Sequence, residues 1–124
     1  MPIADRRSGA LTSPERFRLE EAVRKAELTS RVEFSVFLGA ADGPPRAYAV
    51  RLHETLKTPS RTVLVFVDPV AGALEVVTGG DVRRTLTDQE VGLAVQEMLG
   101  SFAEQDLVGG LIRGIGLLAE HARS

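Results

Sequence analysis

Two aspartates that follow expected strands are the residues best placed to do chemistry. Asp42 comes shortly after the segment 32–38, and Asp68 closes the segment 62–68. If these segments are neighbouring parallel strands, both carboxylates lie near the carboxyl edge of the sheet, where open α/β sheets place ligands. Carboxylate oxygens are the ligands that Ca²⁺ and Mg²⁺ prefer. The pair therefore predicts a divalent-metal site, and the alternative is that each aspartate only shapes a turn.

A second candidate group follows the expected strand 73–78. Its two glycine amides and two guanidiniums are suited to bind a phosphate in a small nest. The alternative is a flexible turn that leads into a solvated helix start, where an aspartate interacts favourably with the helix dipole. Because the preceding strand runs antiparallel, we expect this group at the opposite edge from Asp42 and Asp68. Its members are Gly79, Gly80, Asp81, Arg83, Arg84 and Asp88.

Scarce residue types exclude several kinds of site. The chain has no cysteine, and its two histidines are His53 and His121. A disulfide framework, a cysteine-ligated zinc, a thiolate nucleophile and a three-histidine metal site within one chain are therefore excluded. We expect His53 at the surface or its boundary and His121 in a fraying terminus, neither in a catalytic role. A phosphate-ester hydrolase built from these residues would have to use metal-activated water.

Composition and charge indicate one ordinary soluble domain. Of 124 residues, 44% are hydrophobic and 26% are charged, and the net charge of −2 lacks the basic excess of a dedicated nucleic-acid binder. Arg6 and Arg7 form a twin-arginine pair, but no apolar stretch of the length needed for export follows them. The longest apolar run, 63–67, is far too short to span a bilayer. We expect a cytoplasmic protein with a disordered tail over 1–10, a single domain over 11–124, and a monomeric or weakly homodimeric state.

Helix starts are the clearest local signals. Thr12 with Glu15, and Thr87 with Glu90, have the spacing of capping boxes, and Asp106 is a typical N-cap residue. Apolar residues at helical spacing follow each of these starts. Helices are expected from the first box to about residue 29, from Pro44-Pro45 to 58–60, from the second box to about 102, and from Asp106 to about 122.

Strands are expected at 32–38, 62–68 and 73–78, which gives the order α-β-α-β-β-α-α. The segment 62–68 is apolar on both faces, as in an inner strand. Strand, helix and strand in succession imply a parallel pair, and the hairpin adds an antiparallel neighbour. The predicted fold is a three-layer α/β/α sandwich with a small mixed sheet of three to four strands and helices on both faces. Glycines at 109, 110, 114 and 116 predict a close approach to the last helix, either within the chain or at a dimer seam.

The segments Leu86-Thr87-Asp88, Phe102 with Gln105-Asp106-Leu107, and Gly109-Gly110-Leu111 resemble the closing signature of the TPM domain family. The opening 11–16 is similar to the first helix cap of that family, and the segments 36–39 and 74–79 resemble an actinobacterial branch of unknown function. The chain has Gln105 and Leu107 where the family has glycine and tyrosine, and its glycine-rich stretch is reduced to Gly79-Gly80.

Members of the TPM family range from a reported acid phosphatase to proteins without demonstrated catalysis, and some bind divalent metals through loop carboxylates. The resemblance therefore implies a non-catalytic module that binds a ligand, an ion or a protein. The alternative is a phosphatase-like hydrolase that uses Ca²⁺ or Mg²⁺ at Asp42 and Asp68, with Arg46 or Arg61 holding the phosphate.

Overall fold

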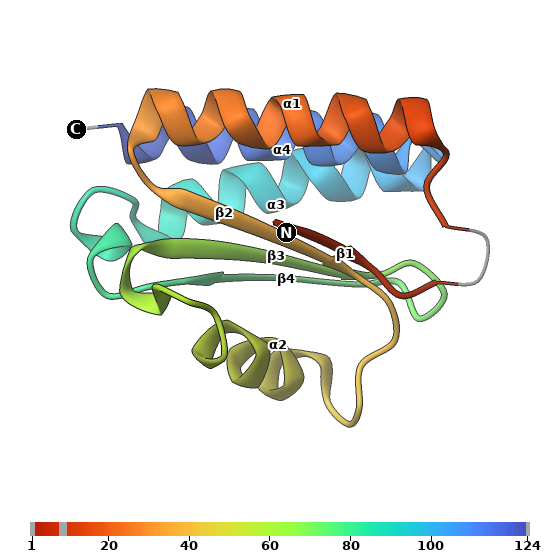
Figure 1. The fold of residues 1–124 in the computed structure, drawn as a ribbon. Helices are drawn as coiled ribbons and strands as arrows, with labels where there is room; N and C mark the ends of the chain where they lie inside the picture. The colour runs from red at the N-terminus through yellow and green to blue at the C-terminus, as the bar shows by residue number, and fades with distance from the viewer. Residues whose placement is uncertain (1, 8–9, 124) are drawn as a thin grey trace.

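The computed structural model describes residues 2–7 and 10–123 and confirms the predicted α/β class. A four-stranded mixed sheet has α1, α3 and α4 on one face and α2 on the other (Figure 1). Two short 3₁₀ turns, η1 and η2, flank the hairpin. The bounds are β1 Ile3–Asp5, α1 Ser13–Ser30, β2 Glu33–Leu38, α2 Pro45–Glu54, η1 Pro59–Arg61, β3 Thr62–Asp68, β4 Ala73–Thr78, η2 Val82–Arg84, α3 Asp88–Ala103 and α4 Leu107–Ala122.

The sheet has the order β1-β2-β3-β4. As predicted, β2 pairs in parallel with β3 and β3 pairs antiparallel with β4. The expected disordered tail over 1–10 is wrong for residues 2–7, because β1 pairs in parallel with β2 and places Ile3 opposite Val36. Ile3 is 2% exposed, so its burial helps to hold this short strand in place. Residues 1, 8 and 9 of the expected tail lie outside the described residues.

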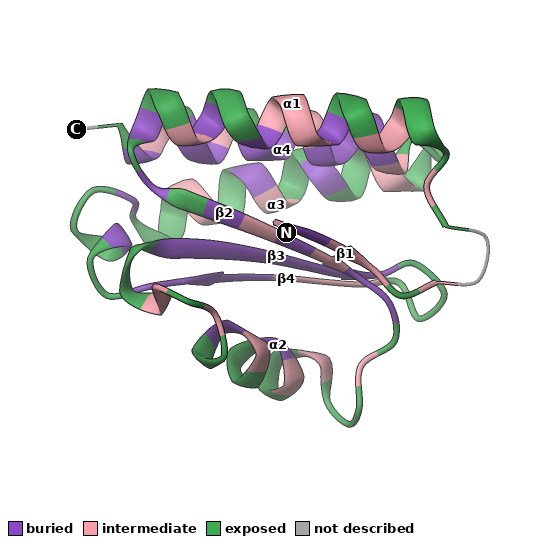
Figure 2. Cartoon of the chain, viewed as in Figure 1, coloured by how far each residue is buried: buried purple, intermediate pink, exposed green. Residues whose placement is uncertain are grey.

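All seven residues of β3 are buried, which agrees with an inner strand covered on both faces (Figure 2). Side chains alternate between the two faces. Val63, Val65 and Val67 belong to the larger core formed with α1, α3 and α4. Leu64 and Phe66 belong to the smaller core formed with α2. This alternation fixes the face on which each later residue of the sheet lies.

Both predicted capping boxes are present. The Thr12 hydroxyl accepts the Glu15 amide at 3.2 Å and the Glu15 carboxylate accepts the Thr12 amide at 2.8 Å. Thr87 and Glu90 make the same exchange at 3.2 and 2.9 Å. The hydrogen bond from the Thr87 amide lowers the pKa of Glu90. Asp106 accepts the Gly109 amide at 3.0 Å and starts α4 as predicted.

Replacing Thr87 with alanine is expected to lower the free energy of unfolding by about 1 kcal/mol, because an amide of the first turn of α3 loses its acceptor. Urea denaturation followed by circular dichroism measures this loss. Thr29→Ala is the matched control, because Thr29 is exposed in the last turn of α1 and has no part in a capping box. Equal unfolding midpoints for the two variants would contradict the prediction.

Two glycines of α4 leave space that side chains of α3 occupy. A Cβ on Gly114 would overlap the side chain of Met98, and a Cβ on Gly110 would come within 2.7 Å of the Ser101 Cβ. At these two positions the close approach is within the chain, whereas a Cβ on Gly116 would meet open space. The packing of α3 against α4 therefore accounts for two of the four glycines without a dimer.

The outer edge of β4 carries two arginine contacts. Arg46 Nη1 donates to the Val76 carbonyl at 2.8 Å, and Arg83 Nη1 donates to the Thr78 carbonyl. Both carbonyls point away from β3, because Val77 between them and Gly79 after them lie at the hydrogen-bonded positions of the ladder. The two guanidiniums therefore occupy acceptors that would otherwise be open at the end of the sheet.

Among the described residues, no helix has both the length and the apolar character needed to cross a bilayer.

Candidate functional site

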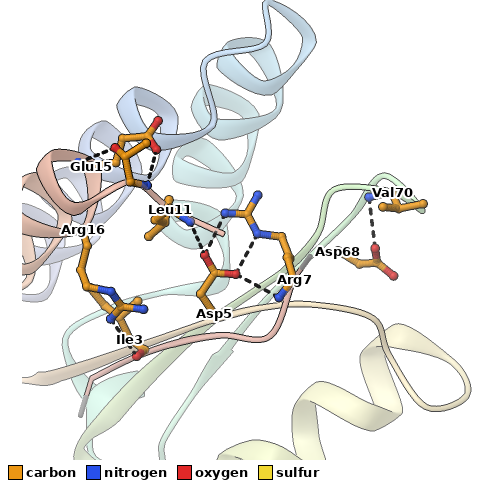
Figure 3. Close-up of polar contacts among 9 residues, drawn as sticks. Ile3, Asp5, Arg7, Leu11, Glu15, Arg16, Asp68 and Val70 are labelled. Carbon is orange, nitrogen blue, oxygen red and sulfur yellow. Dashed lines mark hydrogen bonds and ion pairs between the residues drawn. The ribbon is translucent and has the colours of Figure 1, made fainter. Parts of the chain in front are cut away.

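The structure gives the predicted metal pair two different environments. Asp68 ends β3 and is 7% exposed, and its Oδ1 accepts the amides of Val70 at 3.2 Å and Ala71 at 3.1 Å (Figure 3). These bonds shape the turn, which is the alternative role expected for this aspartate. Asp42 is exposed in the loop that leads into α2, and its carbonyl accepts Arg51 at 3.0 Å. Within residues 2–7 and 10–123, no three histidine or acidic side chains come together as metal ligands.

Two of the amides in the predicted phosphate nest already have partners. The Gly79 amide donates to the Thr62 carbonyl at 3.1 Å, and the Asp81 amide donates to the Ser60 carbonyl at 2.9 Å. The Arg83 guanidinium donates to the Thr78 carbonyl. The two amides join the segment after β4 to β3 and to η1, and Arg83 joins η2 to the end of β4. Of the other predicted members, Gly80, Arg84 and Asp88 are exposed, and Asp88 lies in the first turn of α3.

His53 does not lie at the surface or its boundary as expected. It is 7% exposed, and its Nε2 donates to the Thr62 carbonyl at 2.9 Å. The packing of α2 on the sheet buries the ring, and this tertiary contact is not visible in the local pattern. His121 Nδ1 lies 3.2 Å from Glu90 Oε2 and links the end of α4 to the start of α3. Both histidines therefore connect elements of the fold.

A buried ion pair lies in the segment that was expected to be disordered. Asp5 closes β1, and its side chain is 0% exposed. Its carboxylate accepts Arg7 Nε at 2.9 Å and Nη2 at 3.0 Å, and it also accepts the amides of Arg7 at 3.1 Å and Leu11 at 2.8 Å (Figure 3). The two-point contact fixes the plane of the Arg7 guanidinium. The Asp5–Arg7 pair is therefore a rigid feature at the carboxyl edge of the parallel strands.

The surroundings keep both members of the pair charged. Burial alone would raise the pKa of Asp5, but the hydrogen bonds from Arg7 and Leu11 and the guanidinium charge outweigh it and lower the pKa to about 2. The hydrogen bond to Asp5 raises the pKa of Arg7. At neutral pH neither group is poised to exchange a proton.

A cleft of about 520 Å³ lies beside this pair, between the β3–β4 turn and the corner that joins α3 to α4. Most of its lining residues are apolar. Strand alternation directs the side chains of Val67 and Leu74 toward α3 and α4, whereas Asp68 lies on the α2 face with Phe66. Arg7 is thus the charged side chain on the helix side of the lining. The lining residues are Arg7, Val67, Asp68, Pro69, Gly72, Ala73, Leu74, Leu99, Phe102, Ala103, Gln105 and Leu107.

Sequence reasoning missed Asp5, Arg7 and the cleft. One signal was available, because residues two apart lie on the same face of an extended strand, so an Asp-x-Arg pattern after Ile3 is compatible with a strand-end ion pair. The cleft itself has no local signal. Its walls come from Arg7 in the segment after β1, from the β3–β4 hairpin, from the end of α3 with the corner that follows it, and from the start of α4.

Comparison with known proteins places the chain in a family. The family described as a domain of unknown function, DUF5130, matches residues 6–119. The chain belongs to the DUF5130 family. Two uncharacterised proteins of Mycobacterium tuberculosis, Rv2468c of strain H37Rv and MT2543 of strain CDC 1551, are each 31% identical to this DUF5130 chain over 101 residues. The match covers 82% of the chain and 60% of each of these longer relatives.

Solved structures share the fold of this DUF5130 protein. The N-terminal domain of cg2496 from Corynebacterium glutamicum has a TM-score of 0.81 at 13% identity, over 96% of this chain and 78% of that domain. The BA42 protein from Bizionia argentinensis has a TM-score of 0.82 at 19% identity, over 90% and 81%. An N-terminal domain of a P. gingivalis protein has a TM-score of 0.79 at 16% identity, over 95% and 79%. At these identities the likeness concerns the fold alone.

Proposed function

We propose that this DUF5130 protein is a non-catalytic binding module of the TPM-like kind that holds a ligand in the cleft at the carboxyl edge of its sheet. The observation that carries the proposal is the apolar cleft of about 520 Å³ with the fixed Arg7 guanidinium on its wall. Small-molecule pockets combine mostly apolar walls with a few placed polar groups in the same way, at volumes of roughly 300–1,000 Å³. The resemblance of the two helix caps at Thr87 and Asp106 to the TPM signature supports the same assignment.

The chemistry of the Asp5–Arg7 pair favours binding over catalysis. Four hydrogen bonds occupy the Asp5 carboxylate, which leaves it poorly placed to act as a nucleophile or a general base. Arg7 keeps its proton at all physiological pH values. A fixed cation beside apolar walls orients a ligand and does not transfer protons to it.

The probe 8-anilinonaphthalene-1-sulfonate tests this proposal, because it joins an apolar ring system to an anion. We expect a saturable one-to-one rise in its fluorescence at neutral pH, and shifts of the amide signals of Leu74, Phe102 and Leu107. Leu99→Gln should weaken binding. Leu93→Gln should not, because Leu93 is an exposed leucine of the same helix outside the cleft lining. Absence of saturable binding, or amide shifts confined to another surface, would refute the proposal.

A second candidate is the divalent-metal-dependent, phosphatase-like hydrolase at Asp42 and Asp68. It is favoured by one observation. The Oδ1 atom of Asp68 accepts two backbone amides, whereas no described residue donates a hydrogen bond to its Oδ2, so Oδ2 is available to a cation. The two arginines proposed to hold phosphate have other contacts. Arg46 contacts Glu75 and the Val76 carbonyl, and Arg61 donates to the Arg31 carbonyl at 3.0 Å.

Titration with CaCl₂, MgCl₂ and MnCl₂ distinguishes the two functions. A hydrolase requires shifts of the amide signals of Asp42 and Asp68, together with turnover of p-nitrophenyl phosphate that Asp68→Asn abolishes. Such turnover would replace the binding-module proposal. Unchanged amide signals with all three metals would exclude the proposal of a metal-dependent hydrolase.

A further inference from the structure

We infer that the ligand of the cleft is an amphipathic acid, a molecule whose carboxylate meets Arg7 while its apolar body lies against the hairpin and α3. This inference rests on the proposed function and adds the chemical class of the ligand. Two properties of the cleft carry it: the sign of the charge on its wall and the position of the apolar side chains relative to that charge.

The charge at the cleft is a positive group with donors to spare. Asp5 engages Nε and Nη2 of Arg7, and no described residue accepts a hydrogen bond from Nη1 (Figure 3). Arginine carries five N–H donors in one plane, so the end formed by Nη1 and Nη2 is still able to hold a second carboxylate. The Asp5 side chain is fully enclosed, while that of Arg7 is 18% exposed. The ligand therefore meets the guanidinium and not its counter-ion.

The strand faces separate this cation from the nearby aspartate. The side chain of Asp68 belongs to the α2 face of β3, with Leu64 and Phe66. Asp5 and Arg7 belong to the other face, because Ile3, two residues before Asp5, lies in the core with α1 and α4. An acid bound at Arg7 is thus separated from Asp68 by the sheet, and the Asp5 carboxylate on its own face is enclosed and paired with Arg7. The start of α4 at Leu107 also lines the cleft.

The apolar walls supply the second half of the recognition. Leu74 of β4, and Leu99 and Phe102 of α3, line the cleft, and Leu99 is 42% exposed. An apolar chain that covers these side chains gains binding free energy with each methylene it buries. We expect roughly fourfold tighter binding for each buried methylene, up to the length at which the chain leaves the cleft.

Three eight-carbon compounds with different head groups test the inference: octanoate, octylammonium and 1-octanol. Octanoate has the shortest alkyl chain of the three, because one of its carbons is the carboxyl carbon, so tighter binding of octanoate cannot come from its tail. Titrations followed by amide shifts at Leu74 and Phe102 should give octanoate an affinity about tenfold above that of the alcohol, with octylammonium the weakest. Hexanoate, octanoate and decanoate should bind in order of increasing affinity. Octylammonium that binds as tightly as octanoate, or an affinity independent of chain length, would overturn the inference.

Variants separate the head from the chain. The double variant Asp5→Asn with Arg7→Gln removes the cation without leaving a buried unpaired carboxylate, and it should abolish the preference for octanoate over octanol. Arg6→Gln is the matched control, because Arg6 is the neighbouring arginine and lines a groove on the α2 side of the sheet with Ala4 and Leu52. Retention of the octanoate preference in a folded double variant would overturn the inference.

Leu99→Gln keeps the ion pair and replaces a partly exposed side chain, so it tests the inference even if the double variant does not fold. It should flatten the dependence on chain length while the preference for octanoate remains, and an unchanged chain-length dependence counts against the inference. The sulfonate probe keeps the two proposals apart. If the probe binds at the cleft while the three eight-carbon compounds bind equally, the inference of an acidic ligand is wrong and the proposed binding function is retained. If neither the probe nor any octyl compound binds, the proposed function fails.

Discussion

Gly79→Ala is expected to lower the free energy of unfolding by about 3 kcal/mol, at the upper end of the usual cost of overpacking. A Cβ at Gly79 would overlap the backbone of Pro59 and Ser60, and backbone atoms are less able to move aside than the end of a flexible side chain. The same glycine donates its amide to the Thr62 carbonyl, which also accepts His53. The substitution therefore disturbs the junction of β3, β4 and α2 together.

Gly80→Ala is the matched control for this prediction. The nearest heavy atom to a Cβ on Gly80 is the Arg83 Nη2 at 4.0 Å, so an alanine fits. Thermal unfolding should place the Gly79 variant about 10 °C below the wild type and the Gly80 variant close to it. Equal melting temperatures for the two variants would contradict the prediction, because they would mean that the backbone at Pro59 and Ser60 moves aside for the new Cβ.

Asp5→Asn should destabilise the protein by about 2 kcal/mol at neutral pH, because the variant loses the ionic partner of Arg7 and weakens four hydrogen bonds. The lowered pKa of Asp5 implies a contribution of similar size to the free energy of unfolding. It falls from 3.8 to about 2 on folding, and each pKa unit corresponds to about 1.4 kcal/mol. Asp42→Asn, which changes an exposed aspartate, is the control and should leave the unfolding free energy near that of the wild type.

The sign of the pH dependence follows from the same pKa. Because the folded pKa lies below the unfolded value, the stabilisation by Asp5 is complete above the unfolded pKa of 3.8 and is lost as the pH falls toward 2. Urea denaturation at a series of pH values should show wild type and Asp5→Asn converging near pH 2 and separating above pH 4. A difference between the two that stays constant from pH 7 to pH 2 would contradict the lowered pKa.

The parts of the fold that could be predicted are those with local causes. The capping boxes at Thr12 and Thr87 each need only four consecutive residues, and both were found where expected. β1 could not be predicted in this way, because three residues show no periodicity and their order comes from pairing with a strand about thirty residues later. The burial of His53 likewise depends on how α2 lies on the sheet.

The candidate site was predictable in its location and not in its residues. The rule that ligands lie at the carboxyl edge of parallel strands leads to the edge where the cleft is found. At that edge the sequence pattern points to Asp42 and Asp68, and it predicts a tail for the segment that contains Asp5 and Arg7. The buried Asp5–Arg7 pair could not be predicted without β1, because this strand forms by pairing with β2 and places Asp5 at the edge of the sheet.

The two arginine contacts on β4 bear on how the protein behaves in concentrated solution. A strand from a second molecule that pairs with this edge would first have to displace Arg46 and Arg83 from the carbonyls of Val76 and Thr78. Removing a charge-assisted hydrogen bond costs more than a neutral backbone bond returns. The apolar sequence of β4 is thereby kept from templating sheet growth from one molecule to the next, which is the first step toward aggregation.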